Sequence, residues 1–240
     1  MEKYINKIIN ADCMDILKQL PDGCVDLVVT DCPYHIVHKG GGGRCESRWK
    51  TQGQLANYEN TKNGKMFSFN EIKFEEWLPE LYRVLKNDTH CYIMINSRNL
   101  SRLQHIAEQV GFKFQNLLIW KKNNATPNKF YMQQCEFILM LKKGKERWIK
   151  NLGDKNFFDI NNPVGNKLHP TEKPIELMKV FVKNSSNEND LVLDPFSGSG
   201  TTAIACHQLK RRFICIEKDP EYWAKSCERL KAEQAQLQLF

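Results

Sequence analysis

The stretch Val25-Asp26-Leu27-Val28-Val29-Thr30-Asp31-Cys32-Pro33-Tyr34 sets the architecture of the chain. Its first six residues form a nearly continuous apolar run, which is typical of a strand that is buried on both faces. The run stops at a carboxylate, a proline and an aromatic ring, contributed by Asp31, Pro33 and Tyr34. The pattern therefore places a charge, a rigid backbone and a flat ring at one edge of a sheet, which is the geometry of an active site.

Strand and helix patterns alternate on both sides of this stretch. Strands are expected over 5–10, 25–30, 91–95, 112–120, 135–141, 191–193 and 212–217. Helices are expected over 14–20, 74–85, 100–110, 174–182, 201–209 and 220–234. Such alternation predicts an α/β fold with an open, doubly wound, mostly parallel sheet, here of seven strands.

Length and composition favour one domain. With 240 residues, of which 41% are hydrophobic, the chain can build a single large core over residues 1–240. No apolar run reaches the roughly 18 residues of a membrane span, and the N-terminus is too polar for a signal peptide, so we expect a cytoplasmic protein without a membrane partner. The nine cysteines lack any Cys-x-x-Cys pair, which favours reduced thiols. The net charge of +7 is compatible with a polyanion partner but does not require one.

Two segments depart from the alternation. Residues 38–67 contain the run Gly40-Gly41-Gly42-Gly43 and interspersed basic and aromatic residues, so a mobile loop is expected. A disordered surface insert and a loop that orders on a ligand both remain open, and the basic and aromatic content favours the second. Residues 123–168 are expected to be an excursion from the sheet, because they are too few to build their own core.

A glycine-rich turn follows the strand at 191–193. Gly198 and Gly200 free backbone N–H groups at a helix N-terminus, where an anionic group is favoured. Glu217 ends the next strand about 20 residues later, where a ribose-binding acid sits in nucleotide-binding βαβ units. Thr201 follows Gly200 where a P-loop has lysine, so triphosphate chemistry is not expected. The alternative is a glycine turn that only connects the strand to the helix and binds no ligand.

Three motifs taken together resemble the S-adenosylmethionine-dependent DNA amino-methyltransferases. They are Asp31-Cys32-Pro33-Tyr34, His169-Pro170-Thr171-Glu172-Lys173-Pro174 and Asp194-Pro195-Phe196-Ser197-Gly198-Ser199-Gly200-Thr201-Thr202. The resemblance spans nearly the whole chain, and the catalytic motif precedes the glycine motif, as in the circularly permuted β class. It implies a single methyltransferase domain with a Rossmann-like fold and S-adenosyl-L-methionine as cofactor.

The resemblance also implies a role for each motif residue. It assigns the methionine portion of the cofactor to Asp194, Phe196, Gly198, Gly200, Thr201 and Thr202, the ribose hydroxyls to Glu217, the adenine edge to Asp12, and the carboxylate end to His169 and Lys173. Asp31 is expected to contact the cofactor as well as the target base. For His169 and Lys173, a solvated helix start remains the alternative.

The chemistry implied at the opening motif needs hydrogen-bond acceptors. An exocyclic amine on a nucleobase is a poor nucleophile because its lone pair is delocalised, and acceptors aimed at its N–H groups favour the tetrahedral nitrogen of the transition state. Asp31 would supply a carboxylate and Cys32 a carbonyl, with Pro33 fixing the backbone and Tyr34 stacking on the flipped base. The family usually has proline where this chain has Cys32. A capping role for Asp31 and a core position for Tyr34 are the alternatives.

The resemblance favours adenine N6 in double-stranded DNA as the target, because an acid at the first motif position is commoner among adenine-N6 enzymes. Cytosine-N4 methylation, RNA methylation and a DNA-binding module with a vestigial cofactor site remain alternatives, and a homodimer is left open. Target recognition is expected within 123–168, and the loop at 38–67 is a further candidate. Phosphate contacts are expected from Arg44, Arg48, Lys121, Lys122 and Lys129, unless these are simply solvated charges.

A metal site is not expected. Cys32, His35, His38 and Cys45 are of the residue types that ligate zinc. Their spacing matches no usual zinc finger, and glycines fill the interval.

Overall fold

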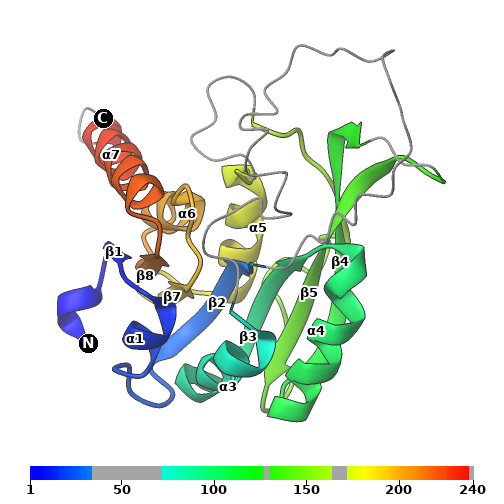
Figure 1. The fold of residues 1–240 in the computed structure, drawn as a ribbon, viewed down its shortest axis with the longest axis horizontal. Helices are drawn as coiled ribbons and strands as arrows, with labels where there is room; N and C mark the ends of the chain where they lie inside the picture. Colours follow the sequence, from blue (N-terminus) through cyan, green and yellow to red (C-terminus); the bar gives the residue numbers. More distant parts are fainter. Residues whose placement is uncertain (34–71, 127–129, 164–171, 238–240) are drawn as a thin grey trace, which may run out of the picture. The chain divides into compact units, whose positions relative to one another are not determined.

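The computed structural model describes residues 1–33, 72–126, 130–163 and 172–237 (Figure 1). The chain divides into two compact units, one formed by Met1–Cys32 with Lys73–Phe240 and the other by Pro33–Ile72. The fold described is that of the first unit, and the expected loop at 38–67 lies outside the described residues. Among those residues, no helix has the length and apolar character needed to cross a membrane.

The first unit is built on one open sheet. Its strands are β1 (Lys7–Asn10), β2 (Val25–Asp31), β3 (Leu85–Ile95), β4 (Lys113–Thr126), β5 (Gln133–Lys143), β6 (Phe157–Asp159), β7 (Leu191–Asp194) and β8 (Arg212–Glu217), in the spatial order β1-β8-β7-β2-β3-β5-β4-β6. Neighbouring strands are parallel except around β5, which is antiparallel to both β3 and β4. The mostly parallel sheet is confirmed, but the described part of the chain contributes eight strands to it, so the expectation of seven is wrong.

The additional strand is β6, in a region where the sequence shows little periodicity. Three residues are too few to display an alternating pattern. The strand is placed by its neighbour β4 instead, with Ile119 opposite Phe157. The indole Nε1 of Trp120 also donates to the carbonyl of Ile160 at 2.7 Å. Tertiary contacts therefore create β6 without a local signal.

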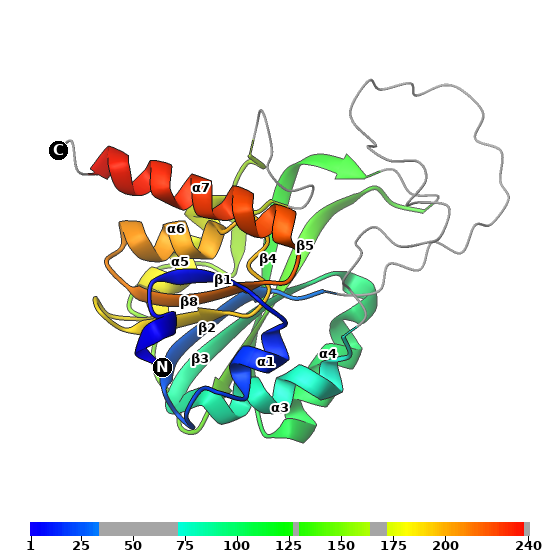
Figure 2. The ribbon, with the colours of Figure 1, turned by 60° about the vertical axis from the view of Figure 1, so that its left-hand side comes forward.

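Helices cover both faces of the sheet, as expected of a doubly wound fold. They are the short η1 (Glu2–Tyr4), α1 (Cys13–Leu17), α3 (Phe74–Val84), α4 (Ser97–Val110), α5 (Ile175–Ser185), α6 (Thr201–Gln208) and α7 (Pro220–Leu237). Figure 2 shows α1, α3 and α4 on one side of the sheet and α5, α6 and α7 on the other.

Helix ends follow the capping signals in the sequence. Asp12 caps α1 by accepting from the backbone N–H of Met14 at 2.9 Å. Gly111 ends α4 in the left-handed region with φ of 117°, where a side chain would be strained. Asp219 accepts from the N–H of Glu221 in the first turn of α7. These short-range signals fix where the helices begin and end.

β3 and β4 extend well beyond their predicted ends. β3 starts at Leu85, before the apolar run, and β4 continues to Thr126 through a polar, basic sequence. Asp31 pairs with Met94 and Ile95 with Phe137, so the first residues of β5 lie past the edge where β2 ends. Residues 121–126 and 130–136 therefore form a protruding β4–β5 arm, which overlaps the first part of the excursion expected at 123–168 (Figure 1).

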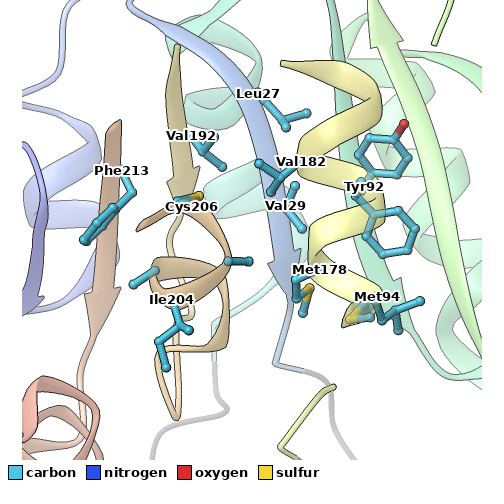
Figure 3. Packing of buried hydrophobic residues seen from close by; sticks show 14 of the residues in the cluster. Leu27, Val29, Tyr92, Met94, Met178, Val182, Val192, Ile204, Cys206 and Phe213 are labelled. Carbon is cyan, nitrogen blue, oxygen red and sulfur yellow. The ribbon is translucent and has the colours of Figure 1, made fainter. Parts of the chain in front are cut away.

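The core nearest the site lies between the sheet and the layer that contains α5 and α6 (Figure 3). Leu27 and Val29 of β2 and Met94 of β3 face this layer. Tyr92 stacks on Phe181 of α5, with ring centroids 4.8 Å apart. Alternate residues of a strand share a face, so each strand that contributes to this core continues the same row of side chains to the edge of the sheet.

Candidate active site

The candidate site lies at the topological switch point of the sheet. β2 and β7 are parallel neighbours, with Leu27 opposite Val192 and Val28 opposite Leu193. The chain leaves β2 through α3 towards β3, whereas it leaves β7 through α6 towards β8 on the other side. Ligands of doubly wound folds bind in the crevice that opens between such strands at their carboxyl ends. The glycine motif therefore lies beside the opening motif in the sheet.

The glycine turn between β7 and α6 adopts the backbone conformation that its glycines permit. Gly198 has φ of 50° and Gly200 has φ of 76°, both in the left-handed region. A Cβ on Gly200 would lie 3.1 Å from Ile8 Cδ1 and equally close to Ser226 Cβ. The turn therefore requires glycine at position 200 for its φ and for its close approach to β1 and α7.

Asp194 organises the start of this turn from a buried position. Its Oδ1 accepts from Thr30 Oγ1 at 2.7 Å and from the N–H of Phe196 at 3.1 Å, and its Oδ2 accepts from Thr202 Oγ1 at 2.6 Å. Burial raises the pKa of Asp194 to about 6. The hydroxyl of Thr202 is directed at Asp194, so these two residues shape the turn.

Glu217 lies beside the glycine turn at the end of β8. Its Oε2 accepts from the N–H of Gly198 at 2.7 Å and its Oε1 from the N–H of Asp219 at 2.8 Å. Burial raises the pKa of Glu217. Asp12 follows β1, the strand next to β8, and its Oδ2 lies 2.8 Å from Lys218 Nζ. Both acids are thus at the same edge of the sheet as the turn.

Trp77 also borders the glycine turn. The sequence pattern predicted only that this residue lies on the apolar face of a helix. The ring of Trp77 on α3 is fully buried and meets the ring of Phe196 edge to face, with centroids 5.2 Å apart. Trp77 Nε1 and Ser197 Oγ are buried and have no hydrogen-bond partner within the described ranges. Buried polar atoms are normally satisfied, so this region fits a ligand that carries hydrogen-bonding groups.

A line of alternating charges begins at Asp31. Lys173 Nζ lies 2.6 Å from Asp31 Oδ2 and 3.3 Å from Glu136 Oε2, and Lys122 Nζ lies 3.0 Å from Glu136 Oε1. Burial raises the pKa of Asp31, and the charge of Lys173 opposes this effect. Burial also raises the pKa of Glu136, but the charges of Lys173 and Lys122 outweigh it and leave that pKa below its usual range. Glu136 was not among the site residues predicted from the sequence.

Cys32 is a buried part of the structure around the site. Its side chain is 2% exposed, and its Sγ donates to the carbonyl of Met94 at 3.4 Å. Burial raises the pKa of this thiol well above its ordinary value. The thiol therefore stays protonated at neutral pH and behaves as a small apolar group rather than a nucleophile.

Arg229 of α7 links the glycine turn to the segment before α5. One guanidinium nitrogen donates to the carbonyl of Ser199 at 3.2 Å and to Thr201 Oγ1 at 3.3 Å. The other lies 2.9 Å from Glu172 Oε1. This arginine was not selected from the sequence, because its role depends on how α7 packs against the turn.

The structure brings together eleven of the predicted site residues: Asp12, Asp31, Cys32, Pro33, Lys173, Asp194, Phe196, Gly198, Gly200, Thr201 and Glu217, with Thr202 directly behind them. Tyr34, Arg44, Arg48, Lys129 and His169 lie outside the described residues.

Two predicted phosphate contacts lie on the β4–β5 arm and are paired with carboxylates. Lys121 Nζ lies 2.6 Å from Asp159 Oδ2, and Lys122 is paired with Glu136. Where the chain is described, no three His, Cys, Asp or Glu side chains are grouped so as to hold a metal ion. Of the four residues considered as zinc ligands, Cys32 is the one that the structure describes.

Comparison with known proteins places this geometry in context. A family model described as DNA methylase matches residues 25–228. The type II methyltransferase M2.DpnII of Streptococcus pneumoniae is 30% identical over 256 residues, which cover 96% of this chain and 92% of the relative. The type II methyltransferase M.HinfI of Haemophilus influenzae is 28% identical, covering 95% of this chain and 69% of the relative.

Solved structures give a consistent result. A crystal structure of the M1.HpyAVI–SAM complex superposes with a TM-score of 0.67 and 29% identity, covering 93% of this chain and 98% of that one. The cytosine-N4-specific PvuII DNA methyltransferase superposes with a TM-score of 0.69 at 17% identity, covering 96% of this chain and 93% of that one. At that identity the second likeness concerns the fold alone.

Proposed function

Since the chain belongs to the DNA methylase family, we propose that it is a site-specific DNA methyltransferase that methylates the N6 amine of an adenine flipped out of double-stranded DNA. The observation that carries the proposal is the position of Asp31. Its carboxylate ends β2 at the switch point, next to the strand that carries the glycine turn. An acceptor for a target amine and a turn suited to a cofactor thus share one crevice.

S-adenosylmethionine, when bound, would supply a methyl group on a positively charged sulfur. Glu217 would accept hydrogen bonds from the ribose hydroxyls, and Asp12 would contact the adenine edge. Phe196, Gly198, Gly200 and Thr201 would border the methionine portion, while Asp194 and Thr202 would act by holding the turn. Lys173 and His169 would close over the carboxylate end. The buried donors without partners beside the turn support such a polar ligand.

Asp31 would act on the target amine by accepting its N–H hydrogen bonds. This interaction favours the tetrahedral nitrogen and stabilises the positive charge that develops on it. The carbonyl of Cys32 would be the second acceptor, in a backbone that Pro33 restrains. Tyr34 would stack on the flipped base and recover part of the cost of unpairing it. None of these steps needs a metal ion.

The β4–β5 arm is proposed to contact the DNA. It projects past the edge of the sheet at which Asp31 lies, and Lys121 and Lys122 belong to it. Lys129 lies outside the described residues and is also proposed to contact phosphates. Near the tip of the arm, Tyr131 is 87% exposed and Met132 is 62% exposed. Exposed aromatic and apolar side chains beside basic ones suit contact with bases and phosphates. Residues 123–168 and 38–67 would supply specificity, with Arg44 and Arg48 contacting phosphates. We place the activity in the cytoplasm and leave a homodimer open.

An acid at the first motif position favours adenine over cytosine as the target, and nucleoside mass spectrometry tests this choice. Unmethylated duplex DNA and RNA would be incubated with the protein and with cofactor carrying a deuterated methyl group. N6-trideuteromethyl-adenine in DNA is the expected product. N4-labelled cytosine would overturn the choice of base, and label in RNA alone would overturn the choice of nucleic acid. Absence of label from both would favour a DNA-binding module with a vestigial site.

A further inference from the structure

We infer that Glu136 is a positioning residue of the active site, which holds the ammonium group of Lys173 against Asp31 and balances its positive charge. Lys173, held in this position, lowers the pKa of Asp31 and so favours the charged carboxylate that the target amine requires. This inference rests on the proposed function, because it gives Glu136 a task only if Asp31 accepts from a target amine. No motif in the sequence contains Glu136.

The register of the sheet places this cluster at the end of apolar rows. Leu27, Val29 and Asp31 are alternate residues of β2, and Met140, Ile138 and Glu136 are alternate residues of β5. The apolar members of both rows belong to the core against α5. Asp31 and Glu136 therefore project from the same face of the sheet, on which Lys173 approaches just before α5 begins.

Because Lys173 is buried, the groups paired with its ammonium group determine its position and its stability there. The side chain of Lys173 is 5% exposed, and its Nζ lies between the carboxylates of Asp31 and Glu136. A buried ammonium group must be paired, and two carboxylates fix its position more firmly than one. If Glu136 were neutral, Lys173 would lose one of the two carboxylates that hold its ammonium group beside the crevice.

Charge balance gives Glu136 a second effect. Asp31, Glu136, Lys173 and Lys122 together carry no net charge. Removal of the Glu136 charge leaves an excess positive charge beside a crevice in which the target nitrogen must become positive. Like charges in a partly buried site repel strongly, so the transition state would be disfavoured.

The titratable groups that face Asp31 shift its pKa in opposite directions. They are Lys173 before α5, Glu136 on β5, Asp194 on β7 and the adjacent Cys32 thiol. The charge of Lys173 lowers the pKa of Asp31, whereas the charge of Glu136 raises it. Neutralising Glu136 should therefore lower the pKa of Asp31, even though it slows the reaction. A variant that merely destabilised the fold would slow the reaction without lowering the pKa of Asp31.

The experiment compares Glu136→Gln with Glu136→Asp, which keeps the charge, and with the control Glu146→Gln. Glu146 is the partner of another buried lysine, Lys142, at 2.8 Å and at the opposite end of β5. The readouts are kcat as a function of pH, cofactor affinity by calorimetry, the thermal unfolding midpoint, and the carboxyl ¹³C titration of Asp31 in the protein without ligands.

For Glu136→Gln we expect kcat to fall about 10- to 100-fold, with cofactor affinity changed less than about 3-fold. The acid limb of the kcat profile and the ¹³C titration of Asp31 should both move to lower pH. Glu136→Asp should recover part of the rate, and Glu146→Gln should match the wild type. If Glu136→Gln unfolds, the comparison of Glu136→Asp with the wild type tests the same effects. The changes in kcat and in the Asp31 titration should then be smaller.

Wild-type kcat in a folded Glu136→Gln variant, or an unmoved Asp31 titration, would overturn the inference. A wild-type protein that methylates no nucleic acid would instead overturn the proposed function. The ¹³C titration separates these two failures, because it measures the coupling of Glu136 to Asp31 without any reaction.

Discussion

Lys173 Nζ lies 2.6 Å from Asp31 Oδ2, although 142 residues separate the two in the sequence. This contact joins the segment before α5, which is assigned to the carboxylate end of the cofactor, to the end of β2, where the target amine would bind. A carboxylate has two oxygens and several lone pairs. Asp31 can therefore hold Lys173 through one oxygen and accept from an amine through the other.

Replacing Lys173 by methionine should raise the pKa of Asp31. The ammonium charge opposes the effect of burial on this carboxyl, and methionine would leave burial and the Glu136 charge to act alone. The acid limb of kcat should therefore move to higher pH, the opposite of the shift expected for Glu136→Gln. A profile that stays in place would show that Lys173 does not control Asp31. Lys142→Met, at the far end of β5, is the matched control.

Gly200→Ala should destabilise the protein more than Gly23→Ala. Both glycines have positive φ, but a Cβ at position 200 would lie 3.1 Å from Ile8 and Ser226, whereas position 23 has nothing within 4 Å. We expect about 1 kcal/mol at position 23 from backbone strain alone and about 2–4 kcal/mol at position 200 from strain plus overpacking. Urea unfolding of the two variants measures the difference. Equal losses would mean that the turn tolerates the extra methyl group.

Titration of Asp194 should make the free energy of unfolding decrease as the pH rises. A carboxyl group whose pKa is lowered in the folded protein would have the opposite effect. The pKa of Asp194 is raised from 3.8 to about 6 in the folded protein, so the folded state binds this proton more tightly than the unfolded state. The stability contributed by its protonation is complete below about pH 4 and is lost as the pH rises through about 6, by up to about 3 kcal/mol.

Asp194→Asn removes this titration. The free energy of unfolding of the wild type, relative to that of the variant, should therefore decrease between about pH 4.5 and pH 7.5. Urea unfolding at the two pH values provides the measurement, and the other carboxyl groups cancel in the comparison. A difference that is the same at both pH values would contradict a raised pKa for Asp194.

Tyr131→Ala should weaken DNA binding and leave cofactor binding unchanged. Loss of one aromatic ring that stacks on a base costs about 1–3 kcal/mol. Trp148→Ala is the control, because Trp148 is also highly exposed, at 75%, but lies outside the β4–β5 arm. Fluorescence anisotropy with a labelled duplex measures both variants. The proposed role of the arm fails if the two variants bind equally well.

Much of the fold could be predicted because its signals are local. The apolar run Val25–Thr30, the cap at Asp12 and the glycine turn after Asp194 each fix a strand, a helix start or a turn through nearby residues. Parallel strands then bring Asp31 and Asp194 to one edge of the sheet, because strands of the same direction end together. The crevice was predictable for this reason.

The remainder depends on contacts between distant segments. Phe157–Asp159 forms a strand because β4 offers an unpaired edge, and Trp77 and Arg229 reach the glycine turn only after α3 and α7 pack. Glu136 shares a face with Ile138 and Met140, so alternation within β5 contained a signal. That signal became meaningful once the register against β3 placed Glu136 at the edge that carries Asp31.

Asp31→Asn is the decisive variant, because asparagine keeps the size of the side chain and removes the charge. The single-turnover rate of methyl transfer to duplex DNA would be measured together with cofactor affinity. We expect the rate to fall at least about 100- to 1000-fold, while the dissociation constant of S-adenosylmethionine changes less than about 3-fold. A variant that methylates DNA at nearly the wild-type rate would contradict the assignment of Asp31 as the acceptor of the target amine.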